Sequence, residues 1–156
     1  MPFQMETYDA VLFDLFGTLI TERGDAVDGA AALLGTMPPK RWAVVTSCPR
    51  GLAQRLIEHS GLPRPPLIVT SDDVQHGKPA PDCYVLAAQR LRAAPERCLV
   101  VEDSRQGVAA GVAAGMTVVA VAGPRSLALE RGDVRVVARL AELRLGVTES
   151  GAIALR

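Results

Sequence analysis

The sequence predicts a doubly wound α/β fold, with a mostly parallel sheet, in a single domain of residues 1–156. Short, continuous apolar runs recur along the chain, and segments with helical patterning lie between them. Continuous apolarity is typical of strands that are covered on both faces, as in a parallel sheet. The alternation of strand and helix favours right-handed crossovers and an open, doubly wound sheet.

Each predicted element follows from a local pattern. The expected central strands are the apolar runs at residues 10–13, 42–45, 67–69, 98–101 and 117–121. The tail beyond Pro124 is less regular, and residues 134–137 are the one further strand expected there. Helices are expected at residues 27–34, 52–59, 82–91 and 105–114. In the second helix Leu52, Leu56 and Ile57 would share the buried face, and Gly61 would end it.

Charge and composition exclude several classes of partner. Seventeen basic and seventeen acidic residues leave no basic excess that would attract nucleic acid or anionic lipid, so we expect neither partner. No apolar run reaches the roughly 18 residues of a membrane span, and the N-terminus does not resemble a signal peptide. The three cysteines form no CxxC pair and no zinc-like cluster with either histidine. A reducing, cytoplasmic location is therefore expected.

Polar residues follow the predicted strands at the points where these end. They are Asp14, Thr46, Ser47, Thr70, Glu102 and Asp103. In an open α/β sheet the carboxyl ends of the strands form the ligand crevice. One strand-end acid is more often a helix cap than a functional group, but several ends with complementary chemistry indicate a site.

Four segments supply that chemistry. Asp14 precedes a tight turn at Gly17 and could aim its carboxylate at a phosphorus or carbon centre. The hydroxyls of the 46–47 pair could donate to a phosphoryl oxygen, and Lys78 places a cation on a proline-stiffened loop. The adjacent acids Glu102 and Asp103 suit a hard divalent cation such as Mg²⁺. Nucleophile, donor, cation and metal are what covalent displacement at a phosphate requires.

The four segments DLFGTL, VVTS, GKPAPDCY and VVEDSRQGVAAGVAAGM resemble, in order, the motifs of the haloacid dehalogenase superfamily. They are most similar to its sugar and polyol phosphatases, near the β-phosphoglucomutase-like branch. The resemblance runs from about residue 8 to residue 121 and implies a Rossmann-like core with a Mg²⁺-dependent phosphatase activity.

The resemblance also implies a role for each motif residue. Asp14 would be the nucleophile that forms an aspartyl-phosphate, and Thr18 would steady its loop. Thr46, Ser47 and Lys78 would bind the transferring phosphoryl group. Mg²⁺ would be held by Asp14, the backbone carbonyl of Phe16 and Asp103, with Glu102 assisting directly or through water.

Phe16 departs from the phosphatase motif, which has a second Asp at this position as general acid and base. Loss of such a group typically costs about 10²–10⁴-fold in rate, so turnover is expected to be slow. Two alternatives stay open. The chain could be a catalytically degraded domain that binds a phosphorylated ligand or a protein, or a 2-haloacid dehalogenase-type hydrolase. Dehalogenating relatives lack the second Asp, but they work without metal, whereas the 102–103 pair resembles a metal site.

The second departure is a missing cap domain. Only residues 15–45 separate Asp14 from Thr46, whereas this branch usually inserts a helical cap of several dozen residues between the first and second motifs. Without a cap the crevice is open. The substrate could be a small phosphorylated molecule or a larger phosphorylated partner, and a second subunit could cover the site. Neither the substrate nor the oligomeric state follows from the sequence.

Structural readings compete with these roles. Thr46 and Ser47 could cap the helix after Pro49, and Lys78 could be a solvated loop lysine. The 102–103 acids could cap the helix that begins near residue 105. His59, His76 and Arg50 are expected at the surface. The glycines spaced by four, at residues 107, 111 and 115, predict close packing of their helix on the sheet.

Overall fold

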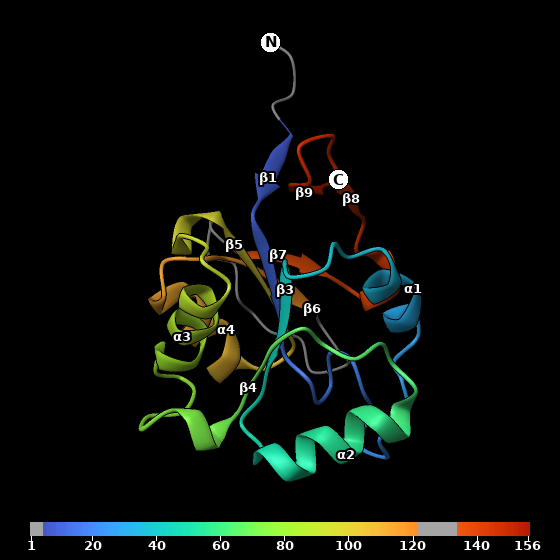
Figure 1. The fold of residues 1–156 in the computed structure, drawn as a ribbon, viewed down its shortest axis with the longest axis vertical. Coiled ribbons are helices and arrows are strands. Elements are labelled where there is room, and N and C mark those ends of the chain that lie inside the picture. Colours follow the sequence, from blue (N-terminus) through green and yellow to red (C-terminus); the bar gives the residue numbers. More distant parts are fainter. Residues whose placement is uncertain (1–4, 122–133) are drawn as a thin grey trace.

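The computed structural model describes residues 5–121 and 134–156, and its centre is a six-stranded parallel sheet (Figure 1). The strand order is β4-β3-β2-β5-β6-β7. The strands are β2 (Ala10–Phe13), β3 (Trp42–Val45), β4 (Ile68–Val69), β5 (Cys98–Glu102), β6 (Thr117–Val121) and β7 (Val134–Val137). The chain moves outward from β2 in one direction and then, from β5, in the other. The predicted doubly wound, Rossmann-like fold is confirmed, and its switch point lies between β2 and β5.

Within the described residues, four helices accompany the sheet: α1 (Ala30–Gly35), α2 (Arg50–Ser60), α3 (Asp82–Arg90) and α4 (Arg105–Ala113). Short 3₁₀ turns are η1 (Ser71–Asp73), η2 (Pro95–Arg97) and η3 (Leu140–Glu142). Figure 1 shows α3 and α4 together on one face of the sheet and α1 on the other. Alternate residues of β2 divide between the two cores, since Val11 and Phe13 join the α1 side while Ala10 and Leu12 join the α3–α4 side. The sheet is therefore buried on both faces, as its continuous apolar strands predicted.

A second, antiparallel sheet of three short strands was not predicted. It consists of β1 (Glu6–Tyr8), β9 (Ile153–Leu155) and β8 (Leu145–Val147), in the order β1-β9-β8. Each strand has three residues, which is too short for apolar periodicity to reveal. This sheet lies at the upper end of the molecule in Figure 1, beyond the amino end of β2.

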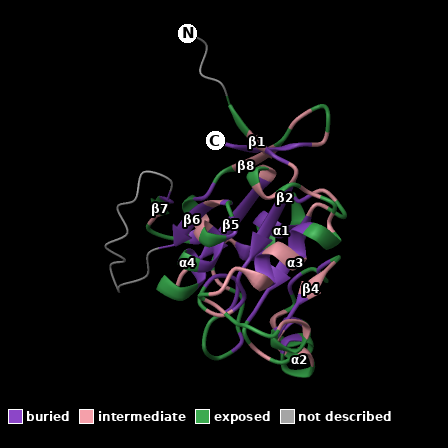
Figure 2. Cartoon of the chain, turned by 90° about the vertical axis from the view of Figure 1, so that its left-hand side faces the viewer, coloured by how far each residue is buried: buried purple, intermediate pink, exposed green. Residues whose placement is uncertain are grey.

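Two predicted helices differ from the structure. The first begins at Ala30 rather than near residue 27, after Gly29 in a left-handed conformation (φ 86°). In α2 Ala53 and Ile57 are buried in the core and Leu56 packs against it, whereas Leu52 is 39% exposed. The prediction that Leu52 belongs to the buried face was wrong. Figure 2 shows why the pattern misled, because α2 lies at the margin of the molecule and is largely exposed.

The glycine spacing in α4 has the predicted packing role at two positions. A Cβ on Gly111 would lie 2.8 Å from a methyl group of Val118, and one on Gly107 would collide with Glu102. Gly115, by contrast, ends the helical segment with a φ of +78°.

Several other predictions concern regions outside the sheet. Residues 122–133, including Pro124, lie outside the described part of the chain, and β7 follows them as predicted. None of the helices in the described ranges is long and apolar enough to cross a bilayer. All three cysteines are free thiols.

Candidate active site

Asp14 is the first residue after β2, and the fold fixes it at the switch point. Its backbone N–H donates to the carbonyl of Val101 on the neighbouring strand (3.0 Å). The chain then turns tightly, because the N–H groups of Leu19 and Ile20 both donate to the carbonyl of Leu15. Gly17 is required in this turn for two reasons. Its φ is +79°, and a Cβ at this position would lie 1.9 Å from a carboxylate oxygen of Asp103.

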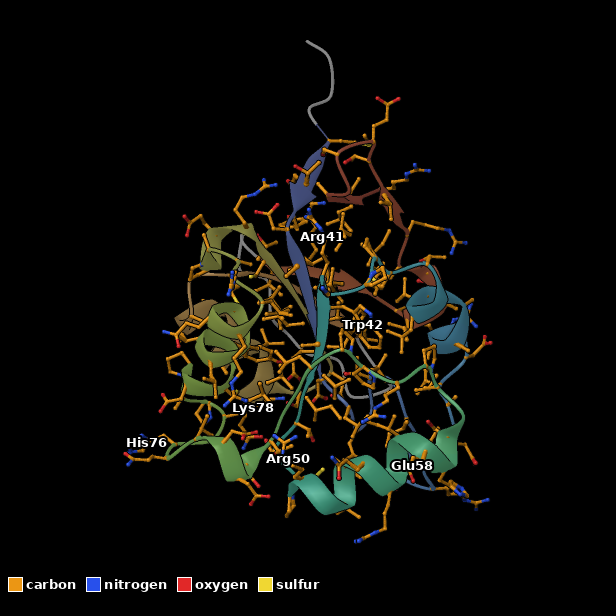
Figure 3. All side chains as sticks on the ribbon, viewed as in Figure 1. Arg41, Trp42, Arg50, Glu58, His76 and Lys78 are labelled. Carbon is orange, nitrogen blue, oxygen red and sulfur yellow. The ribbon has the colours of Figure 1, made fainter. Side chains whose placement is uncertain are left out.

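Lys78 lies inside the site rather than in solvent. Its ammonium donates to Asp14 Oδ1 (2.8 Å), to Glu102 Oε1 (2.6 Å) and to the carbonyl of Val45 (3.1 Å), so all three of its hydrogens have acceptors. The side chain is only 5% exposed. Figure 3 shows Lys78 within the body of the molecule, while His76 of the same loop points outward. The alternative reading of Lys78 as a solvated loop residue was wrong.

Glu102 is fully buried and has a donor at each carboxylate oxygen. Oε1 accepts from Lys78 and from the phenol of Tyr84, both at 2.6 Å. Oε2 accepts from the backbone N–H groups of Asp103 (3.2 Å) and Ser104 (3.4 Å). The cap of α4 is Ser104, whose hydroxyl accepts from the N–H of Gly107, so the helix-cap reading of the 102–103 pair was wrong.

The acidic side chains form a cluster that suits a divalent cation. Asp14, Glu102 and Asp103 each offer an oxygen within 4.8 Å of the other two. The Thr18 hydroxyl lies 3.2 Å from Asp14 Oδ2 and 3.3 Å from Asp103 Oδ1, but its single hydrogen can serve only one of them. Between Asp14 and Asp103 there are therefore more carboxylate oxygens than hydrogen-bond donors to satisfy them. Such a set of hard oxygen ligands fits Mg²⁺.

The electrostatics of the cluster reflect burial and opposing charges. Burial raises the pKa of Asp14 to about 6; Lys78 opposes this shift and the Asp103 carboxyl adds to it. Burial also raises the pKa of Glu102, and the charge of Asp14 acts in the same direction. Burial lowers the pKa of Lys78, but its two carboxylate partners outweigh that effect and hold the pKa above its usual value. Lys78 is therefore positively charged and lies between two carboxyl groups whose pKa values are raised by burial.

The cluster opens into a cavity of about 300 Å³. Its lining consists of Asp14, Phe16, Thr46, Ser47, Cys48, Lys78, Asp103, Ser104 and Gln106. Thr46 is buried, with its hydroxyl 3.2 Å from the backbone nitrogen of Cys48, and Ser47 is exposed. No side chain caps α2 at its N-cap, Pro49, so the capping alternative for Thr46 and Ser47 was wrong. Phe16 is half-buried and packs against the core at the cavity.

Four residues considered in the sequence lie elsewhere. Thr70 follows β4 but is buried, and its hydroxyl accepts from the N–H of Asp72 as the cap of η1. Arg50 is half-exposed and binds Asp73 (2.6 Å) and the carbonyl of Ile68 (3.2 Å). Both residues stabilise the η1 segment and do not line the cavity. His59 and His76 are exposed, as predicted.

Sequence reasoning missed four residues of this region: Cys48, Tyr84, Ser104 and Gln106. Cys48 directly follows the second motif, Ser104 and Gln106 lie within the fourth, and all three line the cavity. Tyr84, the last residue of the third motif, contacts the site from α3 although it is fully buried. Position in or next to a motif could have indicated Cys48, Ser104 and Gln106, whereas Tyr84 lies in a helix whose apolar pattern indicates a core residue.

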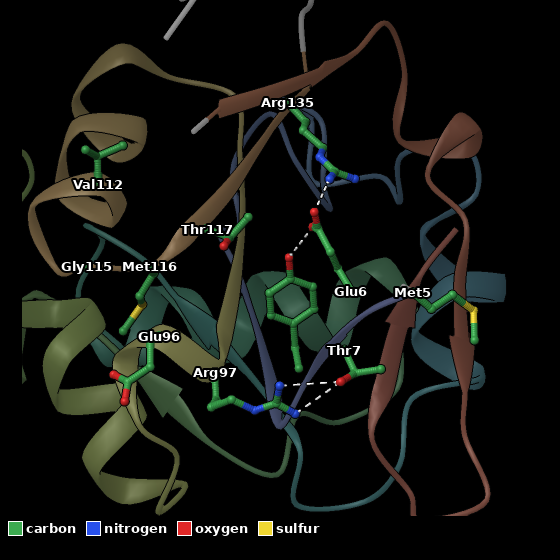
Figure 4. Close-up of a pocket in the computed structure, with 11 residues that line it drawn as sticks. Met5, Glu6, Thr7, Glu96, Arg97, Val112, Gly115, Met116, Thr117 and Arg135 are labelled. Atoms are coloured by element: carbon green, nitrogen blue, oxygen red, sulfur yellow. Dashed lines mark hydrogen bonds and ion pairs between the residues drawn. The ribbon is translucent and has the colours of Figure 1, made fainter. Parts of the chain in front are cut away.

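A larger cavity, of about 870 Å³, lies at the opposite end of the sheet (Figure 4). Two of its charged groups have polar partners there: Arg135 binds Glu6, and Arg97 contacts Thr7 at 3.3 Å. The phenol of Tyr8 donates to Glu6 there (2.8 Å). The convergent carboxylates and the lysine are in the smaller cavity, and we therefore assign the chemistry to it.

Residues 21–115, more than half of the chain, match the family described as haloacid dehalogenase-like hydrolase. The chain belongs to this family. Hexitol phosphatase A of Escherichia coli is 45% identical over 106 residues, which cover 67% of this chain and 49% of that protein. Glycerol-1-phosphate phosphohydrolase 2 of Saccharomyces cerevisiae is 36% identical over 111 residues, covering 65% and 44%. The chain thus spans about half the length of these curated relatives.

A solved haloacid dehalogenase family hydrolase from Deinococcus radiodurans, with bound phosphate and sodium, has a similar structure. The TM-score is 0.71 at 25% identity, and the match covers 86% of this chain and 93% of that one. The resemblance to the sugar and polyol phosphatases of the haloacid dehalogenase family, drawn from the four motifs, is confirmed.

Proposed function

We propose that the chain forms the core of a phosphate-monoester hydrolase that acts on sugar or polyol phosphates through Asp14. The carrying observation is the Lys78 ammonium, 2.8 Å from the Asp14 carboxylate, in a cavity that Thr46 and Asp103 also line. The names of the relatives, a hexitol phosphatase and a glycerol-1-phosphate phosphohydrolase, support this substrate class.

The chemistry follows from the positions of the polar groups. A carboxylate oxygen of Asp14 attacks phosphorus, a bond forms between them, and the bond from phosphorus to the alcohol oxygen breaks. When the ester binds, Lys78 exchanges its hydrogen bond to Asp14 for one to a phosphoryl oxygen, and the Thr46 hydroxyl donates to another, as negative charge develops on them. The Thr18 hydroxyl lies against Asp14 Oδ2, the oxygen that Lys78 does not contact, and so orients the carboxylate. Water then attacks phosphorus and the bond between phosphorus and Asp14 breaks; inorganic phosphate leaves, a proton of the water passes to solvent, and the carboxylate of Asp14 is free again.

Asp14, Asp103 and the backbone carbonyl of Phe16 would hold Mg²⁺. When bound, the cation supplies Lewis-acid polarisation of the phosphoryl oxygens and offsets the charge of the acidic cluster. Glu102 would act from behind these ligands, because Lys78, Tyr84 and two backbone N–H groups already occupy its oxygens.

Residue 16 is Phe and therefore provides no carboxylic acid that could protonate the leaving alcohol. Among the residues that line the cavity, the carboxyl groups are those of Asp14 and Asp103, which serve as nucleophile and metal ligand in this proposal. A leaving group that is stable as an anion needs no proton. We therefore expect aryl phosphates to be hydrolysed much faster than alkyl phosphates.

The test is hydrolysis of p-nitrophenyl phosphate with Mg²⁺ and with EDTA. Asp14→Asn preserves the shape of the side chain and removes the nucleophile, so turnover should fall at least 10³-fold, within the range for loss of a nucleophile. Asp25→Asn, a change of the same kind at an exposed residue, is the matched control and should behave as wild type. Equal rates for Asp14→Asn and wild type, or rates that EDTA leaves unchanged, would overturn the proposal.

A second candidate function is phosphate-ligand binding without turnover, which Phe16 favours. Binding of inorganic phosphate that depends on Lys78, with no hydrolysis of any ester in a panel, would support it. Dehalogenation is favoured less, since the three convergent acids suit a cation that such chemistry does not use.

A further inference from the structure

Tyr84 contacts the site from behind, without reaching the cavity. It lies in α3 and is fully buried. Its phenol donates to Glu102 Oε1 (2.6 Å), the same oxygen that accepts from Lys78 (2.6 Å). The Lys78 nitrogen also lies 5.2 Å from the centre of the Tyr84 ring, within cation–π range. Tyr84 therefore contacts both partners of the ion pair that faces Asp14.

A second helix encloses the Glu102 carboxylate from another side. A Cβ on Gly107 would lie 1.9 Å from the carboxyl carbon and 1.9 Å from Oε1. Ser104, the cap of the same helix, donates its backbone N–H to Oε2 (3.4 Å). The Glu102 carboxylate thus fits between the Tyr84 phenol on α3 and the α4 backbone at Gly107, where a side chain would collide with it.

Packing alone does not require a tyrosine here. A phenylalanine would fill the same volume, whereas a buried hydroxyl is costly unless it has a hydrogen-bond partner. The Tyr84 hydroxyl donates to Glu102, whose other side-chain donors are Lys78 and Ser104. The hydroxyl consequently serves the carboxylate rather than the core.

We propose that Tyr84 is a positioning residue, which fixes the Glu102 carboxylate and thereby holds the Lys78 ammonium against Asp14. The inference rests on the proposed function and adds a residue to it. In this arrangement Glu102 acts as the anchor of the lysine, since its oxygens are turned to the ammonium, the phenol and the backbone. Loss of the phenol frees the carboxylate to move, and the ammonium moves with it.

The experiment compares Tyr84→Phe with Tyr8→Phe. Both changes remove the hydroxyl of a buried tyrosine that donates to a glutamate, but Tyr8 lies at the opposite end of the sheet. With p-nitrophenyl phosphate, Tyr84→Phe should lower kcat about 10-fold, the low end for residues that orient a ligating group from behind. The Mg²⁺ concentration for half-maximal rate should not change, because Asp14 and Asp103 keep their places. Tyr8→Phe should retain the wild-type kcat.

The outcomes separate this inference from the proposed function. If the wild type hydrolyses the ester and Tyr84→Phe matches Tyr8→Phe, Tyr84 is a core residue only and the inference fails. If the wild type shows no turnover, the proposed function fails. Calorimetric binding of inorganic phosphate then tests the positioning by itself, with about 10-fold weaker binding expected for Tyr84→Phe and not for Tyr8→Phe.

Gly107→Ala is the second variant, should Tyr84→Phe not fold. Alanine favours a helix more than glycine does, but its methyl group would displace the Glu102 carboxylate. A loss of kcat with an intact circular-dichroism spectrum supports the inference. Wild-type kcat in a folded Gly107→Ala protein would show that the position of the carboxylate has no bearing on turnover.

Discussion

Phe16 and Asp14 are two positions apart in one turn, and only the second carries a carboxyl group. The side chain of Phe16 lines the cavity, so an acid at this position would reach the leaving alcohol. Phe16→Asp should therefore raise the hydrolysis of an alkyl phosphate such as glycerol 1-phosphate by about 10²-fold or more. The gain with p-nitrophenyl phosphate should be much smaller, because that leaving group needs little protonation.

Phe16→Asn is the matched control, since it has nearly the same shape and polarity but cannot transfer a proton in this way. Initial rates for both esters, measured with the three proteins, give the comparison. If Phe16→Asn accelerates the alkyl ester as much as Phe16→Asp, the gain comes from access or solvation and not from proton transfer.

The short 3₁₀ element η1 joins two helices through a single carboxylate. Asp73 Oδ2 accepts from the N–H of Thr70 (2.8 Å) and from Arg50 at the start of α2 (2.6 Å), and Arg90 at the end of α3 lies 3.8 Å from Oδ1. Burial opposes ionisation, but the Thr70 and Arg50 contacts outweigh it and lower the pKa of Asp73. A lowered pKa stabilises the folded protein above the unfolded value of about 3.9.

Asp73→Asn should reduce the free energy of unfolding at pH 7 by about 1–3 kcal/mol, the usual range for hydrogen bonds to a charged group. As pH falls from about 4 through the lowered folded-state pKa, the contribution of the Asp73 charge is lost progressively, and the difference between the proteins should shrink. Urea unfolding at pH 7 and pH 3 measures this, with Asp25→Asn as the control. A difference that is the same at both pH values would show that the carboxylate charge is not the cause.

At the scale of elements, the sequence predicted those strands and helices that carry a clear apolar pattern. The parallel strands and α4 follow from continuous apolarity and from glycines spaced by four. The strands β1, β8 and β9 could not be predicted, because three residues carry no period and their pairing joins opposite ends of the chain. Leu52 was misplaced because the pattern assumes a helix flat on the core, whereas α2 touches it mainly through Ala53 and Ile57.

The residues of the candidate site also differ in whether the sequence could predict them. Asp14, Thr46, Lys78 and Asp103 could be predicted because each follows, or lies in, a motif at the carboxyl end of a strand. The role of Tyr84 could not be predicted, although this residue ends the third motif, since its hydroxyl reaches Glu102 only once α3 is packed on the sheet. The direction of the Glu102 oxygens also depends on tertiary structure, because Gly107 and Ser104 shape the space around them.

For the whole molecule, binding of a cation to the folded state alone should stabilise it. With Mg²⁺ at about 100 times its dissociation constant, the free energy of unfolding should rise by about 2.7 kcal/mol. Thermal unfolding with and without the cation measures this as a rise in Tm. Asp103→Asn removes a carboxylate that lies against the Gly17 turn and should abolish most of the rise.

Asp82→Asn is the control for this measurement, because Asp82 is a partly exposed carboxylate at the start of α3 that contacts His76 and not the acidic cluster. It should keep the Mg²⁺-dependent rise in Tm. An equal rise in wild type and Asp103→Asn would place the cation elsewhere.

The pairing of β1 with β9 has a practical consequence. Residues 6–8 and 153–155 lie side by side, at the amino end of the parallel sheet, whereas Asp14 lies beyond its carboxyl end. A bead or sensor surface attached through either of these strands would therefore lie at the opposite end of the molecule from the cavity that Asp14 lines. Immobilised protein should accordingly bind bulky phosphate esters as readily as protein in solution, because the attachment point lies away from that cavity.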